Sequence, residues 1–180
     1  MDISLGIFIV PTVVLSVVTF LYFYFKKQVE QKKGYRQTLI IIAAAAFILN
    51  LIWEIAQGPL YEGFEYDLNH LSFCALASVA DMLMVLILYF AFILIYKDIF
   101  WTGYMGITRI GFLILVGGSG AIFAEMWHTA RGDWSYAETM PMVPFAEVGL
   151  LPVLQFALLP WLVFYVGNKI VQASTLGIKL

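Results

Sequence analysis

Long apolar stretches alternate with short polar ones along the whole chain. Five of the apolar stretches come close to or exceed the roughly 20 residues that a transmembrane helix needs. They cover residues 5–25, 39–57, 71–96, 110–127 and 148–170. We therefore predict an all-α integral membrane bundle of five transmembrane helices, which forms a single domain over residues 1–180.

Three acidic residues interrupt these apolar stretches. Glu54 lies near the end of the second stretch, Asp81 lies inside the third, and Glu125 lies near the end of the fourth. Because consecutive spans run in opposite directions, all three carboxyl groups fall in the same half of the predicted membrane. Ionisable residues within spans are costly and usually face the bundle interior, where they mark functional sites. This clustering is the strongest indication of function in the sequence.

Helical spacing places other small and polar residues on the same faces as the acids. The second span has one such face: Ala43, Ala46, Asn50, Glu54 and Gln57. The third span has another: His70, Cys74, Ser78 and Asp81. The fourth span has three glycines, which we expect to permit close helix packing: Gly117, Gly118 and Gly120.

Three further polar residues belong to the same end of the predicted bundle. His128 follows Glu125 by one helical turn, Gln155 lies about two turns into the fifth span, and Glu147 lies in the preceding loop. Together with the two polar faces, these residues predict a pocket in the outer half of the membrane. Its walls would be apolar at depth, and carboxyl groups would lie above them.

The composition excludes a water-soluble protein. Of the 180 residues, 62% are hydrophobic and only 12% are charged, whereas soluble domains carry about 25% charged residues. The single cysteine, Cys74, allows no intrachain disulfide and no cysteine metal cluster, and we expect it in the core. The first residues lack a basic segment and a cleavage site, so we expect no cleaved signal peptide.

The distribution of basic residues predicts the orientation. Nine lie on one side of the predicted membrane: Lys26, Lys27, Lys32, Lys33, Arg36, Lys97, Arg109, Lys169 and Lys179. Only Arg131 lies on the other side. Because cytoplasmic loops carry the excess of Lys and Arg, we predict an outside N-terminus and a cytoplasmic C-terminus. We expect a multi-pass protein of the plasma membrane, the inner membrane in a bacterium.

The predicted pocket suits acid–base chemistry on a lipid or an isoprenoid. A protonated carboxyl group beside a carboxylate can give a proton to an alkene and take another from the resulting carbocation. Aromatic faces stabilise such a cation, and several are available: Trp53, Trp127, Trp134, Tyr136 and Phe156. The chain has no nucleotide, phosphate or nucleic-acid pattern, and this chemistry needs no cofactor and no metal.

These considerations assign roles to eleven residues. The candidate catalytic residues are Glu54, Asp81 and Glu125. The candidate substrate-binding residues are Asn50, Trp53, Gln57, His128, Trp134, Tyr136, Glu147 and Gln155. The expected partners are a lipid or isoprenoid substrate and the surrounding membrane lipids. The sequence carries no indication of the oligomeric state.

Two segments and the overall layout resemble known membrane enzymes of isoprenoid metabolism. The segment "NLIWEIAQGPLY" resembles the Asn-x-x-Trp-Glu segment of the small integral-membrane terpene cyclases of meroterpenoid pathways. That resemblance implies that Glu54 is the acid of a protonation-initiated cyclisation. The segment "GDWSYAETMPMVPFAEVGLLPVLQFALLP" is similar in layout to the last part of the membrane lycopene cyclases. The five spans with acid–base carboxyl groups are also similar to sterol isomerases of the emopamil-binding-protein type.

Two other interpretations remain open: a metal or haem site, and a role without catalysis. The pair Glu125 and His128 has the Glu-x-x-His spacing of di-iron helical bundles, although a second such pair is absent. His70 and His128 are predicted at a similar depth, where they could hold a haem. The other interpretation is not catalytic: the chain would bind a lipid, quinone or pigment, or be an accessory subunit of a membrane complex.

Overall fold

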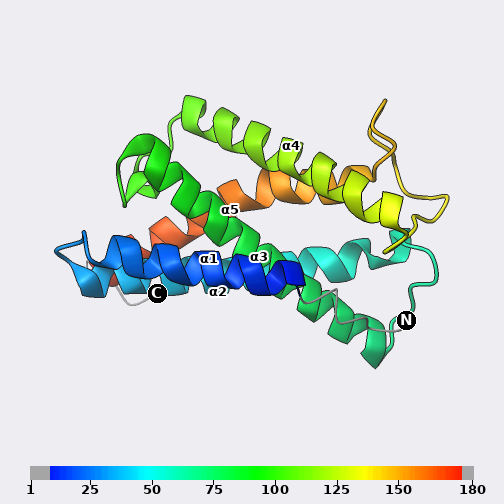
Figure 1. Cartoon of the computed structure of the whole chain (residues 1–180), viewed down its shortest axis with the longest axis horizontal. Coiled ribbons are helices and arrows are strands. Elements are labelled where there is room, and N and C mark those ends of the chain that lie inside the picture. The colour runs from blue at the N-terminus through cyan, green and yellow to red at the C-terminus, as the bar shows by residue number, and fades with distance from the viewer. Residues whose placement is uncertain (1–8, 176–180) are drawn as a thin grey trace.

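The computed structural model describes residues 9–175, and the secondary structure of this range is helical. The main helices are α1 (Ile9–Lys26), α2 (Lys32–Gln57), α3 (Leu68–Tyr96), α4 (Ile107–Arg131) and α5 (Leu150–Thr175), shown in Figure 1. Two short 3₁₀ helices, η2 (Gly58–Leu60) and η3 (Trp101–Gly103), follow α2 and α3. The predicted all-α class is confirmed. The predicted start of the first span at residue 5 and the basic residue Lys179 lie outside the described residues.

Four helical segments are long and apolar enough to cross a membrane: Lys32–Leu60, Leu68–Tyr96, Ile107–Arg131 and Leu150–Ser174. At about 1.5 Å per residue, each exceeds the roughly 30 Å of a hydrocarbon core. Their mean hydropathy in the best window lies between 1.7 and 2.5. The chain is therefore a multi-pass membrane protein by length and composition. The described apolar part of α1 is shorter, Thr12–Lys26.

The predicted helix ends are wrong wherever the helix continues beyond the apolar residues. α2 begins at Lys32 rather than at residue 39, because lysine, arginine and glutamine are good helix formers that hydropathy does not count. α4 continues to Arg131 and ends at Gly132, whose φ of 72° gives the left-handed C-cap. α3 begins at Leu68, because the Asp67 side chain caps its first turn.

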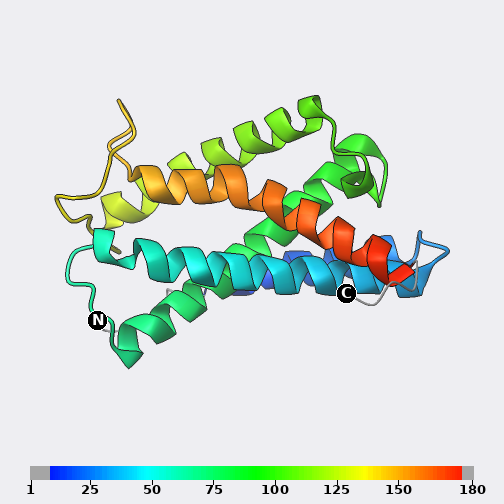
Figure 2. The same cartoon turned by 180° about the vertical axis from the view of Figure 1, so that it is seen from behind.

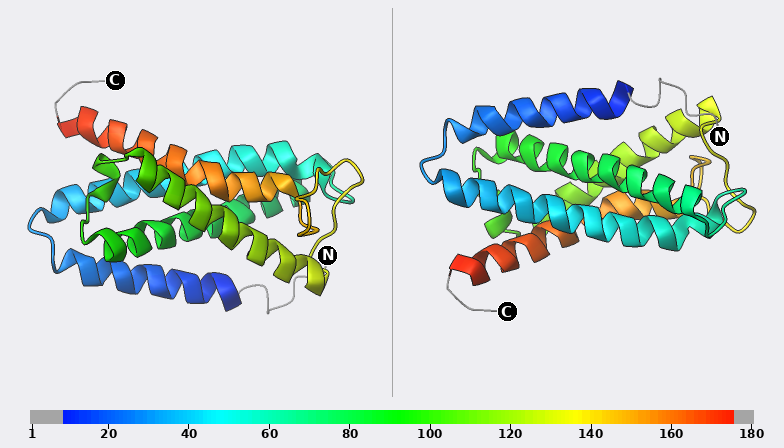
Figure 3. Two further views of the ribbon diagram at one scale, coloured as in Figure 1. Left: turned by 90° about the horizontal axis from the view of Figure 1, so that it is seen from above. Right: turned by 90° about the horizontal axis from the view of Figure 1, so that it is seen from below.

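α2 and α5 lie at the centre of the helix packing, and each packs mainly against two other helices. α5 lies between α4 and α2, α2 also packs against α3, and α1 packs on α3 at the outside of the bundle (Figures 2 and 3). The close contact of α4 with α5 depends on Gly117. A Cβ atom there would lie 2.0 Å from the carbonyl oxygen of Phe156. The expected role of this glycine in close packing is confirmed, whereas a Cβ atom at Gly120 would meet nothing within 4 Å.

A buried aromatic core fixes the end of the bundle where the α3–α4 connection lies. Trp101 is fully buried and donates its indole N–H to the carbonyl oxygen of Tyr89 at 3.2 Å. The Tyr89 hydroxyl donates to the carbonyl oxygen of Ile99 at 2.6 Å. Arg109 donates to the carbonyl oxygen of Trp101 at 3.0 Å and lies 4.4 Å from the ring centre of Tyr96. These contacts hold η3 against the helices.

The loops at the opposite end pair with each other. The backbone N–H of Glu62 donates to Ser135 at 3.0 Å, and that of Ala137 donates to Leu60 at 2.9 Å. Tyr61 and Tyr136 form the isolated antiparallel bridge between these two segments. Figure 1 shows both loops at the same end, near the C-terminal ends of α2 and α4. This pairing fixes the aromatic residues of the 133–137 segment above the polar ends of the helices.

Candidate functional site

The side chain of Gln155 is the centre of a polar cluster that joins three helices. Its amide nitrogen lies 2.9 Å from Asn50 Oδ1 and 2.9 Å from Glu54 Oε1, both on α2. The same nitrogen lies 3.0 Å from Asp81 Oδ2 on α3. Gln155 itself belongs to α5 and is 1% exposed. A carboxamide in the interior therefore holds two carboxyl groups from different helices next to each other.

Gln57 extends this cluster along the same face of α2. Its amide nitrogen donates to Glu54 Oε1 at 2.8 Å and to Gln155 Oε1 at 3.0 Å. Its amide oxygen accepts the indole N–H of Trp53 at 3.0 Å. Asn50 donates to the Ala46 carbonyl oxygen of its own helix at 2.8 Å, which leaves Asn50 Oδ1 free for Gln155. The structure thus brings together four of the predicted binding residues with two of the predicted catalytic ones.

The number of donors in the cluster is smaller than the number of acceptors. An amide nitrogen carries two hydrogens, yet three oxygens lie within hydrogen-bonding distance of the Gln155 nitrogen. Both hydrogens of the Gln57 amide are already used. The carboxyl groups of Glu54 and Asp81 therefore compete for the same two hydrogens of the Gln155 amide. A proton on one of the two carboxyl groups would add the donor that this cluster lacks.

Glu125 forms a second group close to the first. Its Oε2 atom accepts hydrogen bonds from the Tyr136 hydroxyl and, at 3.2 Å, from the Trp134 indole N–H. Glu125 is 8% exposed. Burial and the hydrogen bond to this carboxyl group raise the pKa of Tyr136 to about 12. Tyr136 therefore stays neutral at physiological pH and remains a hydrogen-bond donor to Glu125.

Tyr61 belongs to this site, although its role was not predicted from the sequence. Its ring centre lies 5.6 Å from that of Tyr136 and 6.4 Å from that of Trp134. Burial raises the pKa of Tyr61 above its ordinary value, and the nearby carboxyl groups of Glu125 and Glu54 raise it further. A tyrosine directly after the polar end of a helix was the only signal of this position in the sequence.

Other predicted residues of the described structure make no hydrogen bond to Glu54, Asp81 or Glu125. His128 stacks on Trp134 with ring centres 4.4 Å apart, and its Nδ1 atom lies 2.8 Å from Asp133. Glu147 is exposed at a φ of 52° and has no hydrogen bond or ion pair with the described part of the chain. Trp127 is 60% exposed on the outside of α4, so the expectation that it lies near the pocket is wrong.

The metal-ligand patterns do not converge. His70 lies in the first turn of α3, where its Nδ1 atom contacts the capping residue Asp67 at 2.8 Å. Glu125 is bonded to Trp134 and Tyr136 rather than to His128. Within residues 9–175, no group of three His, Cys, Asp or Glu side chains is arranged to hold a metal ion. The geometry therefore gives the di-iron interpretation no ligand set.

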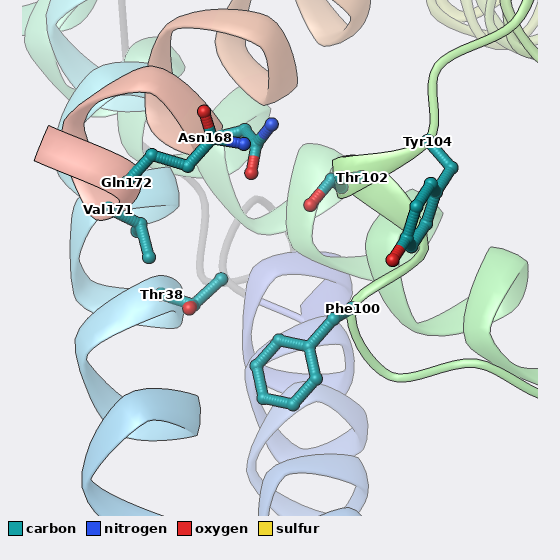
Figure 4. Close-up of a pocket in the computed structure, with 8 residues that line it drawn as sticks. Thr38, Phe100, Thr102, Tyr104, Asn168, Val171 and Gln172 are labelled. Carbon is teal, nitrogen blue, oxygen red and sulfur yellow. The ribbon is translucent and has the colours of Figure 1, made fainter. Parts of the chain in front are cut away.

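Two cavities of the described structure lie away from the carboxyl groups. One, of about 250 Å³, lies between the start of α2, the end of α5 and the α3–α4 connection (Figure 4). The other, of about 400 Å³, is an open groove between α1, α2 and α3 with mostly apolar lining residues and Arg36. Neither is lined by Glu54, Asp81 or Glu125, and the predicted outer-half pocket is not one of them. The centre of the cluster is filled by Gln155.

Comparison with known proteins provides no relative for this chain. No protein-family model, no curated protein and no solved structure matches it. The resemblance to isoprenoid cyclases and isomerases therefore stays a prediction.

Proposed function

We propose that this protein is a cofactor-independent, membrane-embedded acid–base enzyme that isomerises or cyclises an isoprenoid or related lipid. The observation that carries the proposal is the contact of one buried amide nitrogen with both Glu54 and Asp81. Two carboxyl groups that share a proton in an apolar bundle form an acid and a base in one place.

The reaction follows from this shared proton. The protonated member of the Glu54–Asp81 pair gives its proton to one carbon of an alkene, and a carbocation forms at the neighbouring carbon. The carboxylate member then takes a proton from an adjacent C–H bond, whose electrons form the new double bond. Atoms and charge balance: the pair again holds one proton, now on the other carboxyl group, and its transfer back across the pair restores the starting state. Glu54 and Asp81 are mostly buried, and a substrate would approach them over the part of each residue that stays exposed.

Residues around the pair have supporting roles in this proposal. Gln155 and Gln57 orient the two carboxyl groups, and Trp53 lies beside them to face a carbocation. Glu125, held by Trp134 and Tyr136, is the third carboxyl group of the site. Five spans with an outside N-terminus would place this site in the outer half of the bilayer, with α1 as the first span.

Solvent deuterium provides a direct test. The purified protein in detergent is incubated in D₂O with the isoprenoid fraction extracted from membranes of the expression host. We expect an isomer with one deuterium in place of one hydrogen, detected by liquid chromatography and mass spectrometry. Glu54→Gln and Asp81→Asn should each abolish its formation. Glu138→Gln, an exposed glutamate of the outer loop, serves as the matched control and should leave it unchanged.

The outcome separates an enzyme from a structural clamp. If both variants fold with the wild-type elution volume and still incorporate deuterium at the wild-type rate, the proposal is wrong. If wild-type protein incorporates no deuterium and the variants only unfold at lower temperature, the cluster is a hydrogen-bonded clamp of α2, α3 and α5. That second result would favour a lipid-binding or accessory subunit.

A further inference from the structure

A polar cavity lies at the end of the bundle opposite to the carboxyl groups. It measures about 250 Å³ and is lined by Thr38 of α2, Phe100, Thr102 and Tyr104 of the α3–α4 connection, and Asn168 and Gln172 of α5. Asn168 is 13 residues from Gln155 along α5, which corresponds to about 20 Å in a helix. This cavity therefore has no part in the proposed acid–base chemistry.

The hydroxyl oxygen of Thr38 is the distinctive feature of the cavity. Within residues 9–175, it is the only buried side-chain nitrogen or oxygen atom without a hydrogen-bond partner. Thr38 is 5% exposed, so bulk water does not compensate for the missing partner. Buried polar atoms are almost always paired, and an unpaired one calls for a ligand or an ordered water. This oxygen has less than 1 Å² of accessible surface, so a ligand in the cavity would bond to it only after a rotation about the Cα–Cβ bond turns the hydroxyl group into the cavity.

Three other polar side chains share this cavity without bonding to the described residues. Thr102 is 4% exposed, and Asn168 and Gln172 lie four residues apart on one face of α5. In Figure 4 the carboxamide ends of Asn168 and Gln172 lie together and point toward the segment that carries Thr102. Hydroxyl and carboxamide groups both donate and accept hydrogen bonds. Donors and acceptors thus surround one space from three elements.

The lining determines the chemistry of a ligand. None of the lining residues is ionisable at neutral pH, and a charged ligand would be desolvated without an opposite charge. A hydroxyl-rich ligand matches groups that both donate and accept. Phe100 and Tyr104 add ring faces on which the C–H surface of a sugar or polyol can pack. The volume lies just below the 300 Å³ at which ligand pockets typically begin, which suits a small molecule.

We propose that this cavity binds an uncharged polyol, either free or as the headgroup of a neutral lipid. Thr38 and Thr102 bond to its hydroxyl groups from one side, and Asn168 and Gln172 bond from the other. The cavity lies at the end of the helices that carries most of the basic residues, where lipid headgroups meet water. A lipid could therefore reach it from the membrane and a free polyol from the aqueous phase.

Binding is measured on the full chain by thermal shift and native mass spectrometry. The probes are glucose, myo-inositol and monoglucosyl diacylglycerol, with phosphatidylglycerol as the charged comparison. We expect at least one uncharged probe to raise the melting temperature and to give a one-to-one adduct. The soluble probes and the glycolipid distinguish the two sources of the polyol.

Thr38→Val is the sharpest variant because it keeps the shape and removes only the hydroxyl group. Without ligand, its melting temperature should equal or exceed that of the wild type, since an unpaired buried group is gone. Its affinity for the probe should fall about two- to tenfold, the loss of one neutral hydrogen bond. The double variant Asn168→Leu/Gln172→Leu should lose more than tenfold. Thr108→Val, an exposed threonine outside the cavity, is the matched control.

Several results would overturn the proposal. If no uncharged probe binds while Thr38→Val still raises the melting temperature, the cavity holds only water. If a probe binds equally well to the wild type, Thr38→Val and the double variant, its site is elsewhere. Phosphatidylglycerol could bind more tightly than every uncharged probe and lose affinity in Thr38→Val. In that case the ligand of the cavity is charged.

Discussion

Replacement of Gln155 by leucine tests the central feature of the structure. Leucine is similar in size to glutamine and suits an apolar bundle, so the variant leaves no large cavity. It removes the contacts of Gln155 with Asn50, Glu54, Asp81 and Gln57. Two carboxyl groups would then face each other without the amide that lies between them.

The magnitude follows from the contacts that are lost. Hydrogen bonds between helices in membranes average about 0.6 kcal/mol and reach about 1.7 kcal/mol. Hydrogen bonds to charged groups in proteins contribute about 1.5 to 3 kcal/mol. Because Gln155 has four such contacts and two of the partners are carboxyl groups, we expect a loss of about 2 to 5 kcal/mol in the free energy of unfolding.

The assay is reversible unfolding in mixed micelles, with the helical signal followed as denaturing detergent is added. Gln37→Leu is the matched control, because Gln37 also joins α2 to α5 but through a single exposed bond to Ser174 at 2.9 Å. That control should change the free energy of unfolding by less than about 0.5 kcal/mol. A loss for Gln155→Leu no larger than for the control would refute the idea that this amide holds the three helices together.

Three further predictions follow from single contacts. Gly117→Ala should destabilise the protein by several kcal/mol, because its Cβ atom would meet the backbone of α5, whereas Gly120→Ala should be nearly neutral. Tyr136→Phe should cost about 1.5 to 3 kcal/mol through the lost bond to Glu125. The α3 N-cap holds the pKa of Asp67 below its ordinary value, so stability should fall as pH drops through that lower value, and Asp67→Asn should remove this loss.

Each of these has a direct measurement. Thermal unfolding compares the two glycine variants, and equal melting temperatures would contradict the proposed close contact of α4 with α5. The contribution of Tyr136 to the stability of the wild type should also decrease above about pH 10. The tyrosine ionises near this pH in the unfolded chain, whereas its pKa in the folded protein is about 12. The phenylalanine variant should lack that decline. For Asp67, the comparison is the melting temperature of both proteins between about pH 2 and 5, with identical curves as the contrary result.

Part of the candidate site could be predicted from helical periodicity alone. The face of α2 with Asn50, Glu54 and Gln57 needed only the spacing of an α-helix, and the structure places these side chains together. The prediction that Glu54, Asp81 and Glu125 lie at the same end of the bundle followed from the alternating directions of the helices. Both arguments use local geometry and chain order, which a sequence contains.

Other features depend on which helix packs against which, and no periodicity encodes that. Gln155 was one of several predicted binding residues, and only the position of α5 between α4 and α2 makes it the centre of the cluster. Tyr61 joins the site because the loops after α2 and α4 pair through their backbones. His128 turns to Asp133 and Trp134 because the helix C-cap at Gly132 reverses the chain beside it.

The sequence by itself determined the class of this protein, its long apolar helices and the three acidic residues at one end. Apolar length and helical period are properties of single segments, so they need no knowledge of their neighbours. Only the tertiary structure decided which carboxyl groups share a hydrogen-bond donor and which remain apart. It also placed the unpaired hydroxyl of Thr38 beside a cavity that residues of three separate elements line. Contacts between distant segments depend on how whole helices pack, and that is set by all side chains at once.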